Sequence, residues 1–157
     1  MPETLEFRIG NNLKGPRFTL AAAESCTGGL VASRITDTPG SSAYFMGGVV
    51  AYSYEAKAAL LGVSWDTLNG KGAVSQETVL EMAHGARKAF GVDIAVSVSG
   101  IAGPGGGTDE KPVGTTWIGL VAPEREQAEV FYWKGDRRGN KELSADAALK
   151  MVIALLG

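Results

Sequence analysis

Hydrophobic positions along the chain follow two alternating periodicities, which predict helices separated by strands. Apolar residues recur at four-residue intervals from Leu5 to Leu13, and this spacing predicts a short helix over residues 4–14 that Gly15-Pro16 ends. Further helical segments, each with an apolar face or a glycine stop, are predicted over residues 30–35, 55–61, 76–90 and 140–156. Short apolar runs predict strands over residues 18–22, 45–52, 94–98, 115–121 and 130–133.

The order of these segments predicts the fold class. Strands that alternate with helices are typical of an α/β domain, and residues 94–98 have the continuous apolar character of a central parallel strand. The last two strands lie on either side of the polar residues 123–127, which predicts an antiparallel hairpin. We therefore expect one domain over residues 1–157 with a mixed, mostly parallel sheet, because domains usually contain ~100–200 residues.

Composition and charge exclude several classes of protein. The 15 basic and 17 acidic residues give a net charge of −2, which argues against a nucleic-acid partner bound through a basic surface. One Cys and one His exclude a disulfide framework and a Cys/His zinc cage built from this chain, and we expect no metal. The first residues lack the pattern of a signal peptide, and no apolar run reaches the ~18 residues of a membrane span. We therefore expect a cytoplasmic protein without a membrane partner.

Glycine is the residue type in clear excess. Its 22 occurrences in 157 residues are roughly double the usual ~7%. Gly47-Gly48 lie inside the predicted strand 45–52, where a bulge or a nearby ligand would explain them. A denser group follows the strand 94–98 and contains Gly100, Gly103, Gly105, Gly106 and Gly107. Backbone N–H groups in such a segment can approach an anion closely, although a flexible surface loop would have the same composition.

Residues 25–29 also follow an apolar strand directly, and such turns are where open α/β sheets bind ligands. There the Ser25 hydroxyl would project over the sheet edge, and unpaired N–H groups at the start of the next helix could hold an oxyanion. Ser25 or Thr27 would equally well cap that helix. Cys26 is a competing nucleophile, but buried packing is its commoner role. The only imidazole, His84, has nothing in its flanks that supports a catalytic triad.

A serine without a histidine needs another base, and Lys57 is the candidate. Tyr52 ends the second strand and Lys57 lies in the first turn of the following helix, so the two side chains can converge at the corner between them. To act as a base, Lys57 must be neutral, which requires its pKa to fall from ~10.4 to ~7–8. Burial can cause this fall, whereas a nearby Glu24 or Glu55 would oppose it. A lysine on a helix is more commonly a solvated charge, so spacing alone leaves its role open.

Several sequence blocks together resemble the CinA C-terminal domain family, whose enzymatic members are nicotinamide mononucleotide deamidases of the PncC type. The blocks are AESCTGG at 23–29, GSS at 40–42, YS at 52–53, EAK at 55–57, GAVS at 72–75, SGIAGP at 99–104 and KPVGT at 111–115. A single block would be weak evidence, but their occurrence in this order extends the resemblance over most of the chain. Tyr54 departs from the pattern, because the family often has a smaller polar residue at this position.

The resemblance implies a three-layer α/β/α sandwich that hydrolyses the carboxamide of nicotinamide mononucleotide and releases ammonia, in pyridine nucleotide salvage. It implies Ser25 as the nucleophile, Lys57 as its base and Tyr52 as a proton-relay or positioning partner. It also implies a homo-oligomer, with a dimer favoured, and no cofactor. The residues implied in binding the nucleotide substrate are Thr27, Gly28, Gly29, Ser41, Ser42, Gly48, Ser99, Gly100, Gly103, Gly105 and Thr108.

Other functions remain open at this point. A non-catalytic nucleotide-binding or competence/damage-inducible regulatory module would keep the glycine-rich segments and release no ammonia. An amidohydrolase for another small amide would use the same serine and lysine. A domain that only binds partner proteins would instead use aromatic side chains such as Trp65, Tyr132 and Trp133.

Overall fold

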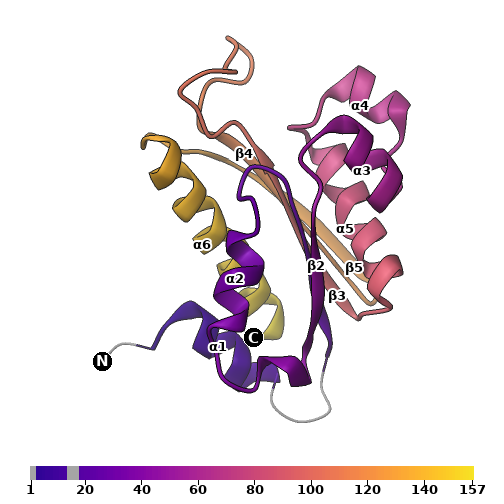
Figure 1. Ribbon diagram of the computed structural model, residues 1–157, viewed down its shortest axis with the longest axis vertical. Helices are drawn as coiled ribbons and strands as arrows, with labels where there is room; N and C mark the ends of the chain where they lie inside the picture. The colour runs from indigo at the N-terminus through magenta and orange to yellow at the C-terminus, as the bar shows by residue number, and fades with distance from the viewer. Residues whose placement is uncertain (1–2, 14–17) are drawn as a thin grey trace.

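The computed structural model describes residues 3–13 and 18–157 and has three layers (Figure 1). The middle layer is a five-stranded sheet made of β1 (Leu20–Glu24), β2 (Phe45–Val50), β3 (Ile94–Gly100), β4 (Thr115–Ala122) and β5 (Arg125–Tyr132). One face is covered by α1 (Leu5–Leu13), α2 (Leu30–Thr36) and α6 (Arg137–Leu156). The other face is covered by α3 (Tyr54–Leu61), α4 (Trp65–Lys71) and α5 (Gln76–Phe90). The predicted three-layer α/β/α architecture is therefore confirmed.

The strand order is β2-β1-β3-β4-β5. β1 pairs in parallel with both β2 and β3, whereas β4 is antiparallel to β3 and to β5. Only β4 thus runs against the other described strands, which confirms the prediction of a mixed, mostly parallel sheet. All five residues of β1 are buried, because β1 lies between two strands and beneath helices on both faces. The small side chains of Ala21, Ala22 and Ala23 let those helices pack closely on β1.

The later elements differ from the sequence-based prediction in several places. The hairpin turn contains only Pro123 and Glu124, and residues 125–127 already belong to β5. β5 lies at the edge of the sheet with one side in solvent. Its first residues can therefore be polar, and they show no apolar run in the sequence. α4 was not predicted, because it buries only Leu68 and therefore shows no apolar periodicity. α6 starts before residue 140, because the Asp136 side chain caps it by accepting the Gly139 N–H at 2.8 Å.

The N-terminal segments agree with the prediction in type but not in every boundary. α1 ends at Leu13, and residue 14 and the predicted break at Gly15-Pro16 lie outside the described residues. β1 starts two residues after Phe18, whose side chain is exposed, and continues to Glu24. Leu20 to Glu24 are the residues that pair with both neighbouring strands, so the ladder rather than the apolar run sets the limits of β1.

The two glycines inside β2 have a structural explanation. The register of β2 against β1 shifts between Phe45 and Gly47, which is the predicted bulge. A Cβ atom at Gly47 would lie 2.5 Å from a ring carbon of Phe90, so only glycine fits beneath that ring. Gly48 faces α2, where a Cβ atom would lie 3.4 Å from that of Ala32. Close packing on both faces of β2 therefore explains Gly47-Gly48.

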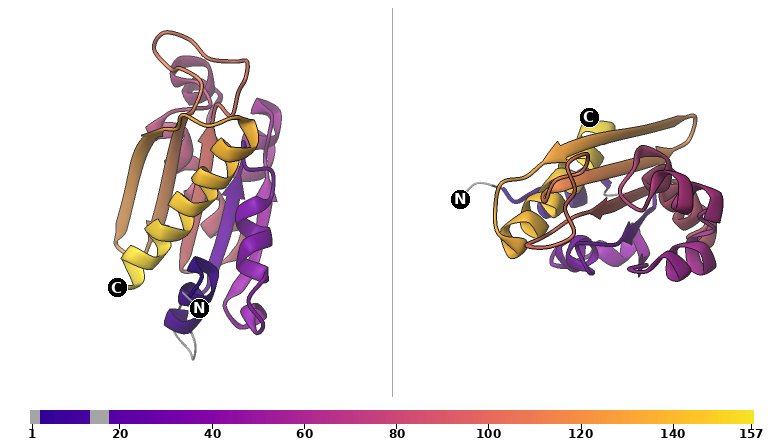
Figure 2. Two further views of the ribbon diagram at one scale, coloured as in Figure 1. Left: turned by 90° about the vertical axis from the view of Figure 1, so that its left-hand side faces the viewer. Right: turned by 90° about the horizontal axis from the view of Figure 1, so that it is seen from above.

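The parallel strands bring their carboxyl ends to one edge of the sheet, the upper edge in Figure 1. The turn 25–29, the segment 51–53 and the loop 101–114 all leave the sheet there, and α6 begins at the same edge. Figure 2 shows that the loop 101–114 rises beyond the start of α6. In the described part of the chain, no helix has the length and apolar character needed to cross a membrane.

Candidate active site

The side chains of Ser25 and Lys57 meet at the carboxyl end of β1. Lys57 Nζ lies 2.8 Å from Ser25 Oγ, and it also donates to the carbonyl oxygens of Ala51 at 2.9 Å and Tyr52 at 3.1 Å. Lys57 is 0% exposed and Ser25 is 7% exposed. The structure therefore brings together the predicted nucleophile and the predicted base, and three partners hold the amine in place.

The corner between β2 and α3 carries Lys57 to this position. β2 ends at Val50, and the Ser53 side chain caps α3 by accepting the N–H of Ala56 at 3.0 Å. Lys57 lies in the first turn of α3, and its own N–H donates to the Ser53 carbonyl at 3.1 Å. The first turn of α3 thus directs the lysine back over the end of the neighbouring strand β1.

Burial lowers the pKa of Lys57 to about 8, and the nearby Cys26 thiol opposes this shift only in part. A neutral lysine amine has two N–H groups and one lone pair. The two carbonyl groups of Ala51 and Tyr52 can only accept hydrogen bonds, whereas the Ser25 hydroxyl can also donate. The surroundings of Lys57 therefore suit the neutral form, with its lone pair facing the Ser25 hydroxyl.

The Glu24 carboxylate, next to Ser25, is buried and caps the start of α2. Its donors are the Thr27 hydroxyl at 2.6 Å and the N–H groups of Gly29 at 3.2 Å, Val31 at 2.9 Å and Ala32 at 3.0 Å. Because this carboxylate caps α2, the Ser25 hydroxyl is not needed as a cap. The expectation that the first N–H groups of this helix are free to hold an oxyanion is wrong, because Glu24 already accepts three of them.

The Thr27 backbone N–H is a remaining donor in this turn. In the described residues it has no hydrogen-bond partner, whereas the N–H groups of Ser25 and Gly28 donate to Val98 and Ser25 carbonyls. It lies two residues after the nucleophile, on the same tight turn as Gly28, whose φ is +61°. This N–H group therefore has no acceptor within the described protein, which is a requirement for a donor to an oxyanion.

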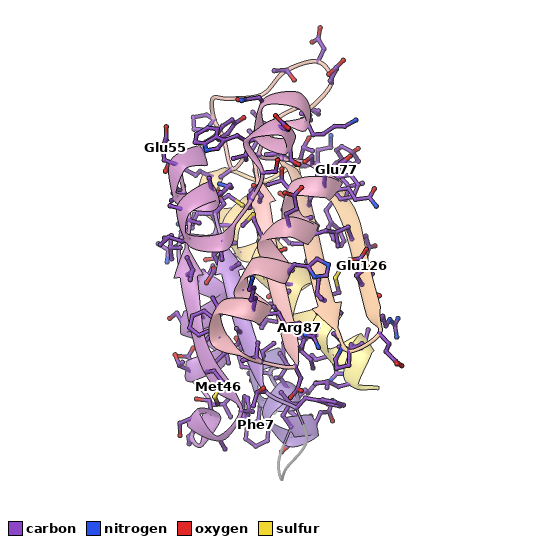
Figure 3. All side chains as sticks on the ribbon, turned by 90° about the vertical axis from the view of Figure 1, so that its right-hand side faces the viewer. Phe7, Met46, Glu55, Glu77, Arg87 and Glu126 are labelled. Atoms are coloured by element: carbon purple, nitrogen blue, oxygen red, sulfur yellow. The ribbon has the colours of Figure 1, made fainter. Side chains whose placement is uncertain are left out.

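The alternative nucleophile and base lie in unsuitable surroundings. Burial raises the pKa of the Cys26 thiol to about 11, so the thiolate is scarce at neutral pH. His84 Nε2 lies 2.6 Å from Glu126 Oε2 on β5, three strands away from β1. Figure 3 shows Glu126 at the edge of the molecule opposite Glu55, which belongs to α3. His84 therefore belongs to a surface pair that is remote from Ser25.

Tyr52 contributes to the site through its backbone. Its carbonyl oxygen accepts from Lys57 Nζ, whereas its side chain is 61% exposed. The phenol oxygen accepts from Arg137 Nη2 at 3.2 Å and contacts neither Lys57 nor Ser25 among the described residues. These contacts support a positioning role for Tyr52 and provide no direct path for a proton relay through its hydroxyl.

Most of the residues implied in substrate binding lie at the same edge as Ser25. This group comprises Thr27, Gly28 and Gly29 in the turn, Ser99 and Gly100 at the end of β3, and Gly103, Gly105 and Thr108 in the loop 101–114. Packing also explains the glycine at position 100, because a Cβ atom there would lie 2.5 Å from Thr116 Oγ1. Arg137 Nη1 donates to the Gly103 carbonyl at 2.7 Å and so joins this loop to α6.

Ser41, Ser42 and Gly48 lie elsewhere. Ser41 and Ser42 belong to the short helix η1 (Ser41–Ala43), which precedes β2 at the lower edge in Figure 1. Because β2 is parallel to β1, the residues before β2 lie at the opposite edge from Ser25. Gly48 pairs with Ala22 within the ladder and packs against α2. A single chain therefore does not bring these three residues to Ser25.

Two residues near the site were not predicted from the sequence. Arg137 contacts both Tyr52 and Gly103, and Lys141 Nζ would lie 3.8 Å from a Cβ atom at Gly28. The sequence contains a signal for both residues, namely cations in the first turns of a helix. Such cations oppose the helix dipole and are disfavoured, so their presence there indicates a role other than helix stability. The sequence-based prediction began this helix at residue 140, so Arg137 lay outside the helix and the signal was not visible.

Known proteins are similar to this chain over nearly its whole length. The CinA C-terminal domain family matches residues 2–156. A CinA-like protein of Chloroherpeton thalassium is 51% identical over 156 residues, which are 97% of this chain and 37% of that protein. A CinA-like protein of Geotalea uraniireducens is 54% identical over 135 residues, which are 86% of this chain and 32% of that protein. The chain thus spans about a third of the length of these relatives.

Solved structures show the same fold. The competence/damage inducible protein CihA of Agrobacterium tumefaciens has a TM-score of 0.95 and 41% identity, with 99% of this chain and 95% of that chain covered. A CinA superfamily protein of Klebsiella pneumoniae has a TM-score of 0.93 and 34% identity, with 97% and 95% covered. Because the family match, the relatives and the folds all agree, this chain belongs to the CinA C-terminal domain family.

Proposed function

We propose that this chain is an amidohydrolase that converts nicotinamide mononucleotide to nicotinate mononucleotide and ammonia. The observation that carries the proposal is the 2.8 Å contact between Ser25 Oγ and the fully buried Nζ of Lys57. The lowered pKa of Lys57, about 8, makes a neutral amine accessible near physiological pH. The substrate follows from the resemblance of the blocks around Ser25 and Lys57 to the deamidases of the family.

In the acylation half of the reaction, Lys57 activates Ser25. The neutral amine accepts the hydroxyl proton while Ser25 Oγ forms a bond to the amide carbon. The Thr27 backbone N–H, which has no hydrogen-bond partner among the described residues, is one candidate donor for the resulting oxyanion. The Lys57 ammonium then gives its proton to the amide nitrogen as the carbon–nitrogen bond breaks, so ammonia leaves and an ester to Ser25 remains.

In the second half, water takes the place of the ammonia. Lys57 accepts a proton from this water, whose oxygen attacks the ester carbon. The proton returns to Ser25 Oγ as the ester bond breaks, which releases the carboxylic acid and restores the enzyme. The carbonyls of Ala51 and Tyr52 hold Nζ in one place through both halves. A single lysine thus serves as base and acid in turn.

Ammonia release from the purified chain with nicotinamide mononucleotide tests this proposal. We expect one ammonia for each nicotinate mononucleotide formed, and a fall in rate of at least ~10²-fold in Ser25→Ala. Cys26→Ala is the matched control, because it removes the neighbouring side chain and should keep most of the activity. Equal ammonia release from Ser25→Ala and the unchanged chain would refute the serine mechanism, and loss only in Cys26→Ala would favour the thiol.

The names of the similar proteins support a second candidate function. The Agrobacterium tumefaciens protein is described as competence/damage inducible, which would fit a regulatory module that binds a nucleotide without turnover. Such a module would bind nicotinamide mononucleotide in calorimetry and release no ammonia. The ammonia assay therefore separates the two functions.

A further inference from the structure

Three cationic side chains gather where α6 begins, close to the turn that carries Ser25. They line a pocket of about 400 Å³ whose residues are Leu30, Arg137, Arg138, Lys141 and Glu142. The Lys141 ammonium lies against Gly28, and the Gly28 N–H donates to the Ser25 carbonyl at 3.1 Å. The pocket is therefore separated from the nucleophile by a single turn of chain.

Two of the three cations in this pocket, Arg137 and Lys141, form no ion pair among the described residues. The Arg137 guanidinium donates to two uncharged oxygens, the Gly103 carbonyl at 2.7 Å and the Tyr52 hydroxyl at 3.2 Å. Lys141 is half-buried and, among the described residues, its ammonium has neither a hydrogen-bond partner nor an ion-pair partner. Only Arg138 has a carboxylate, that of Glu142 at 3.3 Å. The pocket therefore holds three positive charges and one negative charge.

The position of these cations on α6 opposes the helix dipole. Arg137, Arg138 and Lys141 lie within the first five residues of the helix, and the acidic residue at its start is the N-cap Asp136, whose carboxylate accepts the Gly139 N–H. Cations near a helix N-terminus are unfavourable, whereas an anion there is stabilised. The chain as a whole carries a net charge of −2, so this cluster is not a consequence of general basicity. The Asp136 carboxylate offsets part of this cost, and an anion bound between Arg137 and Lys141 would offset more of it.

We infer that this pocket binds the phosphate monoester of the substrate, with Arg137 and Lys141 as the groups that hold it. The inference rests on the proposed function, and it moves the phosphate away from Ser41 and Ser42, which lie at the opposite edge of the sheet. In a mononucleotide, the ribose and the ring separate the phosphate from the carboxamide. Lys141 of the pocket lies against Gly28, three residues along the turn from Ser25, so this inference places the phosphate at the pocket and the carboxamide at Ser25.

Arg137 also links the phosphate pocket to the reacting groups. Its guanidinium contacts the Tyr52 side chain, and the Tyr52 carbonyl accepts from Lys57 Nζ. Its contact with the Gly103 carbonyl also fixes the loop 101–114 against α6. A phosphate held by Arg137 therefore lies beside the residues that position the base, which favours substrates that carry the phosphate over those that lack it.

Calorimetry with ribose 5-phosphate tests the pocket without any turnover, because this probe has the phosphate monoester and no carboxamide. We expect the unchanged chain to bind ribose 5-phosphate and not ribose. Lys141→Ala should weaken binding roughly ten- to hundredfold, since hydrogen bonds to charged groups contribute ~1.5–3 kcal/mol each. Lys141→Arg should keep most of the affinity. The matched control Lys150→Ala changes an exposed lysine on the same helix outside this pocket and should bind like the unchanged chain.

Equal affinity of Lys141→Ala and the unchanged chain for ribose 5-phosphate would overturn the inference, as would equal binding of ribose. Kinetics separate its failure from that of the proposed function. If the chain releases ammonia and Lys141→Ala has the same KM for nicotinamide mononucleotide, the pocket is not the phosphate site, while the deamidase proposal stands. If Lys141→Ala loses ribose 5-phosphate and the unchanged chain releases no ammonia, the phosphate pocket stands and the deamidase proposal fails.

Discussion

The Ala51 N–H donates to the Glu24 carbonyl at 2.8 Å, and this bond joins the segment that leads to Lys57 to the strand that leads to Ser25. It continues the parallel pairing of β1 with β2 by one residue beyond Val50. Because the Ala51 carbonyl also accepts from Lys57 Nζ, one residue fixes both the corner and the amine. The pairing of β1 with β2 thus sets the distance between Ser25 and Lys57. A substitution that shifts this pairing should therefore change activity.

The activity should depend on the ionisation of Lys57. Because burial lowers its pKa to about 8, kcat/KM for nicotinamide mononucleotide should rise as the pH passes through about 8 and then level off as the amine becomes neutral. Ammonia release measured between pH 6 and about 9.5 would show this rise. Cys26→Ala should keep the same profile, since the thiol has a pKa of about 11. A rate that falls with pH across this range would contradict a lysine base.

Replacement of Lys57 by methionine should stabilise the protein while removing activity. Between about 8 and the ordinary lysine value of 10.5, the unfolded chain binds more protons at this residue than the folded chain, so stability rises with pH in that window. Below about 8, the buried amine costs up to about 3 kcal/mol of stability, reduced by its two carbonyl contacts. Urea unfolding at pH 7 and 10 measures this, and a larger gain for Lys57→Met at pH 10 than at pH 7 would contradict it.

Glu24→Gln should destabilise the protein and reduce activity. The change removes the negative charge from a buried cap that accepts four hydrogen bonds at the start of α2. The free energy of unfolding should fall by at least about 1 kcal/mol, because a neutral amide interacts less favourably with the helix terminus. Denaturant unfolding measures the change, and the exposed Glu55→Gln is the matched control. Equal stability of the two variants would argue against Glu24 as the cap.

Asn140→Ala should raise KM more than it lowers kcat. The Asn140 amide is buried, donates to the Ala102 carbonyl at 3.0 Å and accepts the Gly135 N–H at 2.9 Å. It therefore holds the start of the loop 101–114 against α6, beside the proposed phosphate pocket. Loss of these bonds should cost about 1–3 kcal/mol of stability. Steady-state kinetics and thermal unfolding measure both effects, and an unchanged KM would show that the loop does not depend on Asn140.

The structure confirms the parts of the prediction that depend on local sequence. Helical and extended periodicities are set by neighbouring residues, so the α/β class, all five strands and the main helices were recognisable. The position of Ser25 in a turn directly after a strand is also a local property, and it was predicted correctly. α4 and the first residues of α6 were missed, because a capped segment with little buried surface has almost no periodic signal.

Only the tertiary structure decided which residues share one edge of the sheet. Ser25 and Lys57 are 32 positions apart, and their contact depends on the parallel pairing of β1 with β2. The same pairing carries Ser41 and Ser42 to the opposite edge. Burial and strand pairing depend on residues that are distant along the chain. One linear segment therefore cannot reveal that the pKa of a lysine is lowered or that cations gather beside the site. The sequence by itself thus determined the elements and the chemical groups, and long-range packing decided which groups meet.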